Sequence, residues 1–366
     1  RSIDGLEWNV KNQKIIGKAT TSGDFTLIAY GLFHSDKGYK QKIESSFRLT
    51  IIPDPRSLWK NLEPDEKLPY PKSHNDSDSL ETEDNNILLF ASKRGRSHAH
   101  IGTFRDDDGK IVTTPSGWSV LCVADGAGSC SLSREGSKIV TDSATNMLIE
   151  LLSFQNGNDI ETLFLENLDS PSPELEEELQ KKLEETIVSA SYHALKAIHQ
   201  KAQDTNQHIK EFSTTLLLTA HKKVERGHII LSFWIGDGVI AIYHKGQKIE
   251  ILGEPDSGEF AGQTRFLSND IFNKKSVAKR TSINLVKDFT ALILATDGVS
   301  DPFFNTDENL KKIEKWDDFW KDFSKNIEIS NPEKSSNNIL SWLDFWSIGN
   351  HDDRSIALLL PEGSNV

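Results

Sequence analysis

Short apolar runs bounded by Gly, Asp, Ser or Lys recur along the chain and predict β-strands. The clearest runs cover residues 118–124, 214–220, 228–235, 239–243, 248–252, 291–295 and 355–360. Each run is strand-sized, and even the longest is far too short to span a bilayer. The pattern therefore predicts a protein built largely from short, buried strands.

Longer stretches with a helical period interrupt these strands. In residues 132–152 apolar side chains recur near every third or fourth position. A second helix is predicted to open at Ser172-Pro173 and to carry one apolar stripe as far as Ile198. A Trp- and Phe-rich segment, residues 307–346, predicts a helical insert. Because helices and strands do not alternate strictly, the sequence favours an α+β fold over a parallel doubly wound sheet.

The first 54 residues have a different texture. Short β-prone runs at residues 15–17, 20–30 and 47–52 are separated by polar and glycine residues. Their layout loosely resembles the immunoglobulin-like repeats of bacterial proteins, which implies a small all-β module at 1–54. Several prolines and a polar stretch follow, and they predict an irregular linker at 55–86.

Composition and charge exclude several classes of protein. The chain has 366 residues and a net charge of −13, which opposes binding to nucleic acid or to an anionic membrane surface. Cys122 and Cys130 are its two cysteines, so neither a disulfide framework nor a zinc site is indicated, and a reducing cytoplasm fits. Because the first residue is Arg1 and no signal-peptide pattern follows, we expect the chain to be a fragment of a longer protein.

An apolar strand ends at an Asp-Gly pair three times, at Asp125-Gly126, Asp237-Gly238 and Asp297-Gly298. A further acidic pair, Asp352-Asp353, stands just before the last strand. Any single Asp-Gly is most often an ordinary turn, and Asp4-Gly5 and Asp108-Gly109 occur here without a buried strand before them. Three copies at strand ends instead indicate carboxylates gathered at the rim of a rigid sheet.

Such a cluster has consequences for its ligands. Converging carboxylates without basic partners repel one another unless cations neutralise them. All-oxygen ligation favours magnesium or manganese over zinc or copper. An EF-hand is a poor alternative, because residues 106–109 lack the alternating ligands and the terminal Glu of that loop.

The order and content of the motifs resemble the metal-dependent protein phosphatases of the protein phosphatase 2C family, bacterial branch, over residues 87–361. The matching motifs are Ala124-Asp125-Gly126-Ala127-Gly128, Ser213-Thr214-Thr215-Leu216, Gly236-Asp237-Gly238, Ala295-Thr296-Asp297-Gly298-Val299-Ser300-Asp301 and Asp352-Asp353-Arg354-Ser355. Near the start of that region, Gly95-Arg96-Ser97-His98, Gly102 and Asp106-Asp107 replace the usual Glu-Asp pair.

The resemblance implies a dinuclear site for Mn²⁺ or Mg²⁺. Asp125 would bridge the two ions, Asp297 and Asp352 would complete the ligands of one, and Asp106 and the carbonyl of Gly126 would serve the other.

Three more residues and the fold come with the resemblance. Asp107 would orient bound water, and Asp237 and Asp301 would hold a third, weaker ion together with Asp297. The implied fold is a pair of antiparallel β-sheets between helical layers. The implied reaction is hydrolysis of phosphoserine or phosphothreonine in proteins by a hydroxide that bridges the metals, without a covalent phosphoenzyme.

The chain departs from the family at two positions. Ala127 stands where many members have a histidine thought to protonate the leaving group. The family's phosphate-binding arginine is also out of register, so His98 and Arg96 are the candidates for contact with phosphate. These departures leave a pseudophosphatase that binds phosphoprotein without turnover as the alternative. The expected partners are a phosphorylated protein and a cognate Ser/Thr kinase that the N-terminal module would recruit.

Overall fold

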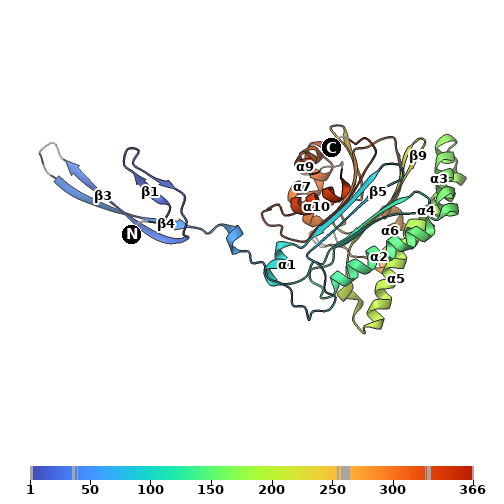
Figure 1. The fold of residues 1–366 in the computed structure, drawn as a ribbon, viewed down its shortest axis with the longest axis horizontal. Helices are drawn as coiled ribbons and strands as arrows, with labels where there is room; N and C mark the ends of the chain where they lie inside the picture. Colours follow the sequence, from blue (N-terminus) through green and yellow to red (C-terminus); the bar gives the residue numbers. More distant parts are fainter. Residues whose placement is uncertain are drawn as a thin grey trace. The chain divides into compact units, whose positions relative to one another are not determined.

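The computed structural model of the chain describes residues 3–34, 38, 40–253, 255–256, 264–325, 327 and 331–364. The chain divides into two compact units, residues 1–60 and 61–366 (Figure 1).

The first unit consists of two antiparallel hairpins and a short 3₁₀ turn. Strands β1 (Leu6–Asn9) and β2 (Lys14–Gly17) pair with each other, as do β3 (Gly23–His34) and β4 (Lys40–Ile51). The turn η1 (Pro55–Leu58) follows them. Many apolar side chains of this unit are exposed, since each sheet has two strands and no helix within the unit covers it.

The second unit contains two antiparallel sheets. The strand order is β13-β10-β9-β8-β7 in the five-stranded sheet and β12-β11-β14-β15-β6-β5 in the six-stranded sheet. The five-stranded sheet comprises β7 (Asp108–Thr113), β8 (Ser119–Ala124), β9 (Leu216–Val224), β10 (Gly227–Ile235) and β13 (Thr281–Val286). The six-stranded sheet comprises β5 (Asn75–Glu81), β6 (Ile87–Lys93), β11 (Val239–His244), β12 (Lys248–Gly253), β14 (Ala291–Ala295) and β15 (Arg354–Leu360).

Helices form two layers outside these sheets (Figure 1). One layer contains α2 (Ser133–Leu151), α3 (Phe154–Asp169), α4 (Pro173–Leu183), a π-helical turn (Glu184–Val188) and α5 (Ser189–Asp204). The other contains α7 (Asp297–Phe304), α8 (Asp307–Leu310), α9 (Ile313–Ser324) and α10 (Pro332–Trp342). The remaining short elements are α1 (Arg96–Ile101), η3 (Ile209–Phe212), η4 (Asn269–Phe272) and α6 (Lys274–Arg280).

The continuous apolar character of the strands follows from burial on both faces. In β8, Val120 and Cys122 join the core beneath the α2–α5 layer, whereas Leu121 and Val123 join the core between the two sheets. A third core packs the aromatic residues of α7, α9 and α10 on the six-stranded sheet. Since successive strand residues alternate between faces, a strand between two cores needs apolar residues at every position. The structure confirms the predicted α+β fold with antiparallel sheets between helical layers.

The structure also differs from the sequence predictions. Residues 61–86, expected to form a linker, belong to the second unit and contribute β5, which pairs with β6. Strands β7 and β13 and helix α3 were not anticipated. The predicted start of α4 is confirmed, because the Ser172 side chain accepts a hydrogen bond from the amide of Leu175 and Pro173 follows it. Within the described residues, no helix has the length and apolar character that crossing a membrane requires.

Candidate metal centre

Three of the predicted aspartates meet at one point of the fold. Asp125 follows β8, Asp237 follows β10, and Asp297 is the first residue of α7, directly after β14 and Thr296. Each offers a carboxylate oxygen, and these oxygens lie within 4.8 Å of one another. The loops of both sheets therefore converge, as the recurring Asp-Gly pattern predicted.

Two of the glycines after these aspartates are required by close backbone contacts. A Cβ on Gly126 would lie 2.6 Å from the carbonyl oxygen of Asp106, and one on Gly298 would lie 1.8 Å from that of Asp353. Neither distance can be tolerated by a side chain, so glycine lets separate loops approach to contact distance.

Threonines fix the Asp125 loop against β9. The Thr214 hydroxyl donates to the carbonyl oxygen of Asp125 at 2.8 Å. The amide of Asp125 donates to the Thr215 hydroxyl, and the amide of Thr215 donates back to the Asp125 carbonyl, both at 2.8 Å. These bonds explain why the Ser213-Thr214-Thr215 motif accompanies the aspartates.

Asp353, which the sequence analysis did not assign a role, organises the neighbouring loop. Its buried carboxylate accepts hydrogen bonds from the backbone amides of Gly95, Asp106 and Asp107. Three amides from two loops thus share one carboxylate, and a charged acceptor makes each bond stronger than a neutral one would. The signal was the acidic pair 352–353, but a pair alone does not show which member turns inward.

Asp107 is buried and held by hydroxyls. Its Oδ2 accepts from the Thr296 hydroxyl at 3.0 Å and from the Ser355 hydroxyl at 2.7 Å. Burial, with the nearby charge of Asp353, raises the pKa of Asp107 to about 7. Asp106 is also buried, and burial raises its pKa to about 6 even though His98 acts to lower it.

His98 is a buried cation among carboxylates. Its Nε2 lies 3.5 Å from Asp352, 3.7 Å from Asp353 and 4.0 Å from Asp106. Its Nδ1 hydrogen-bonds the hydroxyl of Thr103 at 2.9 Å. Burial acts to lower the pKa of His98, but these carboxylates outweigh burial and raise it to about 10. His98 is therefore protonated at neutral pH. Partial burial acts to raise the pKa of Asp352, but the hydrogen bond from His98 keeps it below the ordinary value.

Two further cations, Lys72 and Arg134, contact the loop that carries Asp106–Asp108. Lys72 Nζ lies 2.7 Å from the Asp108 carboxylate and donates to the carbonyl of Asp107 at 2.7 Å. Arg134 Nη1 lies 3.7 Å from Asp106, and the same guanidinium donates to the carbonyls of residues 69 and 70. Both side chains are almost fully buried. The segment before β5 is thereby tied to the loop that carries Asp106 and Asp107.

Among the residues that the structure describes, no cationic side chain pairs with the group formed by Asp125, Asp237 and Asp297. Burial raises the pKa of Asp125 well above its ordinary value, and the charges of Asp107, Asp297 and Asp352 add to the effect. Burial likewise raises the pKa of Asp297, with contributions from Asp237 and Asp352. The charge of Asp352 thus acts on this group from the loop before β15.

Two carboxylate oxygens of the site are left without a donor. Within the described part of the chain, Oδ1 of Asp106 and Oδ1 of Asp237 are buried and accept no hydrogen bond. An unsatisfied buried oxygen is costly unless a cation binds it. The all-oxygen, net-negative donor set therefore fits hard divalent ions such as Mn²⁺ or Mg²⁺.

Two predicted residues lie apart from this group. Asp301 lies one helical turn after Asp297 on α7 and keeps part of its side chain in solvent. Partial desolvation, together with the charge of Asp237, raises its pKa to about 6. Arg96 donates to the carbonyls of Asp344 and Phe345 and to the Asp344 carboxylate. Its guanidinium thus faces the loop after α10.

The comparisons with known proteins agree with this geometry. The family model described as Protein phosphatase 2C matches residues 94–344, more than half of the chain. The chain therefore belongs to the protein phosphatase 2C family. No curated protein matches the chain.

Solved structures with a similar fold include three phosphatases. Serine/threonine phosphatase Stp1 from Staphylococcus aureus is 14% identical, with 83% of this chain and 99% of that chain covered and a TM-score of 0.41. Serine-threonine phosphatase 2C from Toxoplasma gondii is 13% identical, with 78% and 99% covered and a TM-score of 0.48. The catalytic domain of PstP, solved with 2 manganese ions, is 15% identical, with 75% and 98% covered and a TM-score of 0.42.

Proposed function

We propose that this chain hydrolyses phosphoserine and phosphothreonine in proteins at a dinuclear Mn²⁺ or Mg²⁺ site. The observation that carries the proposal is the convergence of Asp125, Asp237 and Asp297 within 4.8 Å with no cationic side chain among them. Asp125 would be shared by both ions, and Asp297 and Asp352 would complete the ligands of one.

The remaining ligands come from the loop next to this group. Asp106 and the carbonyl of Gly126 would hold the other ion. Within the described residues the buried Oδ1 of Asp106 accepts no hydrogen bond, and Arg134 Nη1 lies 3.7 Å from it. Asp107 would orient water, and Asp237 and Asp301 would hold a third, weaker ion with Asp297. When bound, such ions lower the pKa of water, orient the phosphate and neutralise developing charge.

The chain's own residues position the reaction. His98 carries a proton on Nε2 at neutral pH and lies beside Asp352, so it supplies positive charge near the phosphate and fixes the Asp352 carboxylate. We favour His98 over Arg96 for phosphate contact, because the Arg96 guanidinium is already bonded to residues 344 and 345.

Protonation of the leaving oxygen distinguishes two kinds of substrate. Ala127 offers no proton donor where many family members have a histidine. An alkoxide from serine or threonine needs a proton, whereas p-nitrophenolate does not. We therefore expect the gap in rate between aryl and alkyl phosphates to be wider here than in members that keep the histidine.

The test is hydrolysis of p-nitrophenyl phosphate and of a phosphothreonine peptide with manganese. We expect wild-type turnover on both, and loss of at least about a hundredfold in Asp125→Asn, the order found when one group that stabilises transition-state charge is removed. Asp318→Asn, an exposed aspartate on α9, is the matched control and should keep full activity. Tight binding of the phosphopeptide without release of phosphate would instead establish the pseudophosphatase alternative.

The expected partners extend the proposal. We infer that residues 1–54 form an immunoglobulin-like module that recruits the substrate or a cognate Ser/Thr kinase. The exposed apolar side chains of this unit, among them Trp8, Tyr30 and Phe47, support a docking role. Deletion of residues 1–54 should reduce recovery of the partner in a pull-down without lowering p-nitrophenyl phosphate hydrolysis. A cytoplasmic location agrees with the two unpaired cysteines.

A further inference from the structure

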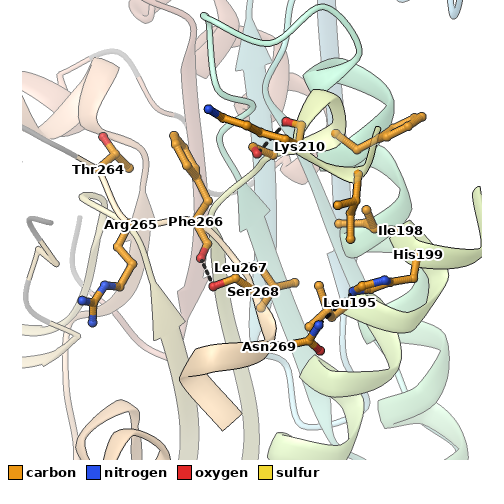
Figure 2. Close-up of a pocket in the computed structure, with 13 residues that line it drawn as sticks. Leu195, Ile198, His199, Lys210, Thr264, Arg265, Phe266, Leu267, Ser268 and Asn269 are labelled. Carbon is orange, nitrogen blue, oxygen red and sulfur yellow. Dashed lines mark hydrogen bonds between the residues drawn. The ribbon is translucent and has the colours of Figure 1, made fainter. Parts of the chain in front are cut away.

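A groove opens between helix α5 and the segment of residues 264–269 (Figure 2). Leu195, Ile198 and His199 of α5 line one wall, and residues 264–269 line the other. The cavity volume is about 520 Å³, within the range of roughly 300–1,000 Å³ that is usual for ligand sites. We call it the α5 groove.

The α5 groove adjoins the acidic cluster through direct hydrogen bonds. The hydroxyl of Thr264, a lining residue, donates to Oδ2 of Asp237. The amide of Leu267, also a lining residue, donates to the carbonyl of Thr214 at 2.9 Å, and the Thr214 hydroxyl contacts the Asp125 carbonyl. These two hydrogen-bonded paths lead from the 264–269 wall of the groove to Asp237 and Asp125 of the metal centre.

The groove combines an apolar floor with a cationic rim. Leu195 and Ile198 form a buried apolar wall, and the half-buried Phe266 ring lies across from α5 (Figure 2). Lys210, which is exposed, lies at the end that η3 closes. His199 is hydrogen-bonded to Asn269, and Arg265 on the opposite wall directs its guanidinium away from α5 (Figure 2). Lys210 is therefore the exposed cation at this end of the groove.

We propose that the α5 groove binds the substrate residues that flank the phosphorylated side chain, and that it selects an apolar residue together with an acidic one. An apolar side chain would remove Leu195, Ile198 and Phe266 from water, and an acidic side chain would pair with Lys210. This inference rests on the proposed phosphatase function of the adjacent aspartates, because those aspartates fix where the phosphate sits.

The experiment compares two phosphothreonine peptides that differ only in their flanks. One carries Leu and Glu on both sides of the phosphothreonine, and the other carries Ala and Lys. We measure kcat/KM for each peptide and, by fluorescence anisotropy, the Kd of each peptide for the Asp125→Asn chain. The wild type should prefer the Leu/Glu peptide by about tenfold, the size of effect that one apolar pocket contact gives.

Two groove variants and one control complete the design. Lys210→Glu should abolish or reverse the preference for the Leu/Glu peptide, and Phe266→Ala should reduce that preference while keeping the backbone carbonyl that accepts from Ser268. Lys321→Glu reverses an exposed charge on α9, and should keep the wild-type ratio between the peptides.

The outcomes separate the groove from the chemistry. If no substrate is hydrolysed but the Kd values still show the preference and its loss in Lys210→Glu, the phosphatase proposal fails and the groove stands. If peptides are hydrolysed but the two flanks give equal kcat/KM and equal Kd values, or if the groove variants leave both ratios unchanged, the groove inference is wrong.

Discussion

The two halves of the acidic cluster are built in opposite ways. The loop of Asp106–Asp108 contains its own counter-charges, because Lys72 pairs with Asp108 and Arg134 and His98 approach Asp106. The group of Asp125, Asp237 and Asp297 contains none. Its nearest polar support comes from hydroxyl groups, such as that of Thr264.

The contrast separates buried carboxylates that have a cationic side chain beside them from buried carboxylates that have none. A buried carboxylate with a cation and hydrogen bonds is stabilised in its charged form, and removal of either partner is costly. Burial raises the pKa of Asp106 to about 6 although its cations act to lower it, and raises the pKa of Asp125 well above the ordinary value, where neighbouring carboxylates add repulsion that a bound cation would relieve. The protein thus places its own cations beside the Asp106–Asp108 loop and Asp352, whereas Asp125, Asp237 and Asp297 have none in the described part of the chain.

The largest difference should appear when Asp353, whose carboxylate binds the amides of Asp106 and Asp107, and Asp125 are each replaced. Asp353→Ala removes the shared acceptor of three backbone amides, and should lower the free energy of unfolding by more than about 4 kcal/mol. Asp125→Asn should leave the metal-free protein equally stable or more stable, because it removes a repelled charge. Urea unfolding in EDTA measures both, and equal destabilisation by the two variants would abolish the contrast.

The Lys72–Asp108 pair gives the next largest effect. Lys72→Met leaves the Asp108 carboxylate buried without its cation and should cost about 3 kcal/mol of stability. The double variant Lys72→Met with Asp108→Leu should recover much of that loss, since no unpaired charge remains. If the double variant were as unstable as Lys72→Met alone, the loss would come from packing and the ion pair would not be the cause.

Removal of metal should make stability depend on pH in a defined direction. The pKa of Asp106 is raised to about 6 and that of Asp107 to about 7, so the folded chain binds more protons than the unfolded chain between about pH 4 and about pH 7. The free energy of unfolding of the metal-free protein should therefore fall as pH rises through this window, by on the order of 1–3 kcal/mol.

Manganese should oppose that fall. Because ionised carboxylates bind the cation and protonated ones do not, the rise in Tm on adding manganese should be larger at pH 7.5 than at pH 5. Thermal unfolding at both pH values, with EDTA or with manganese, provides the comparison. A Tm of the EDTA-treated protein that increases between pH 5 and pH 7.5 would contradict the raised pKa values of Asp106 and Asp107.

The smallest effect is expected at Asp301. This carboxylate is exposed on α7, so Asp301→Asn should change the free energy of unfolding by less than ~1 kcal/mol. It should weaken only the last manganese ion to bind in a calorimetric titration. Loss of the tightest ion would instead place Asp301 among the principal ligands.

Much of the fold, and the group of Asp125, Asp237 and Asp297, could be predicted because their sequence signals are local. A continuous apolar run indicates a strand between two cores. An Asp-Gly pair at the end of such a run indicates a loop at the edge of the sheet, where loops from different strands meet, as at Asp125 and Asp297. The sequence also identified Asp352-Asp353, but only folding shows that Asp353 turns inward to three amides.

The cations that surround the Asp106–Asp108 loop could not be predicted, because they are distant from that loop in sequence. Lys72 lies 35 residues from Asp107, whose carbonyl it contacts, and Arg134 reaches back 65 residues to the carbonyl of Pro69. Strand β5 was missed because its sequence, Asn75–Glu81, is polar and becomes a strand by pairing at the edge of the sheet with β6. Tertiary pairing here overrides local preference.

The central claim is that the group of Asp125, Asp237 and Asp297 is completed by divalent cations. Anomalous scattering from a manganese-soaked crystal tests it most directly. We predict peaks in contact with the carboxylates of Asp125 and Asp297, and loss of the shared peak in Asp125→Asn. An ordered map in which these carboxylates are clearly defined, with no anomalous peak beside them, would contradict the account.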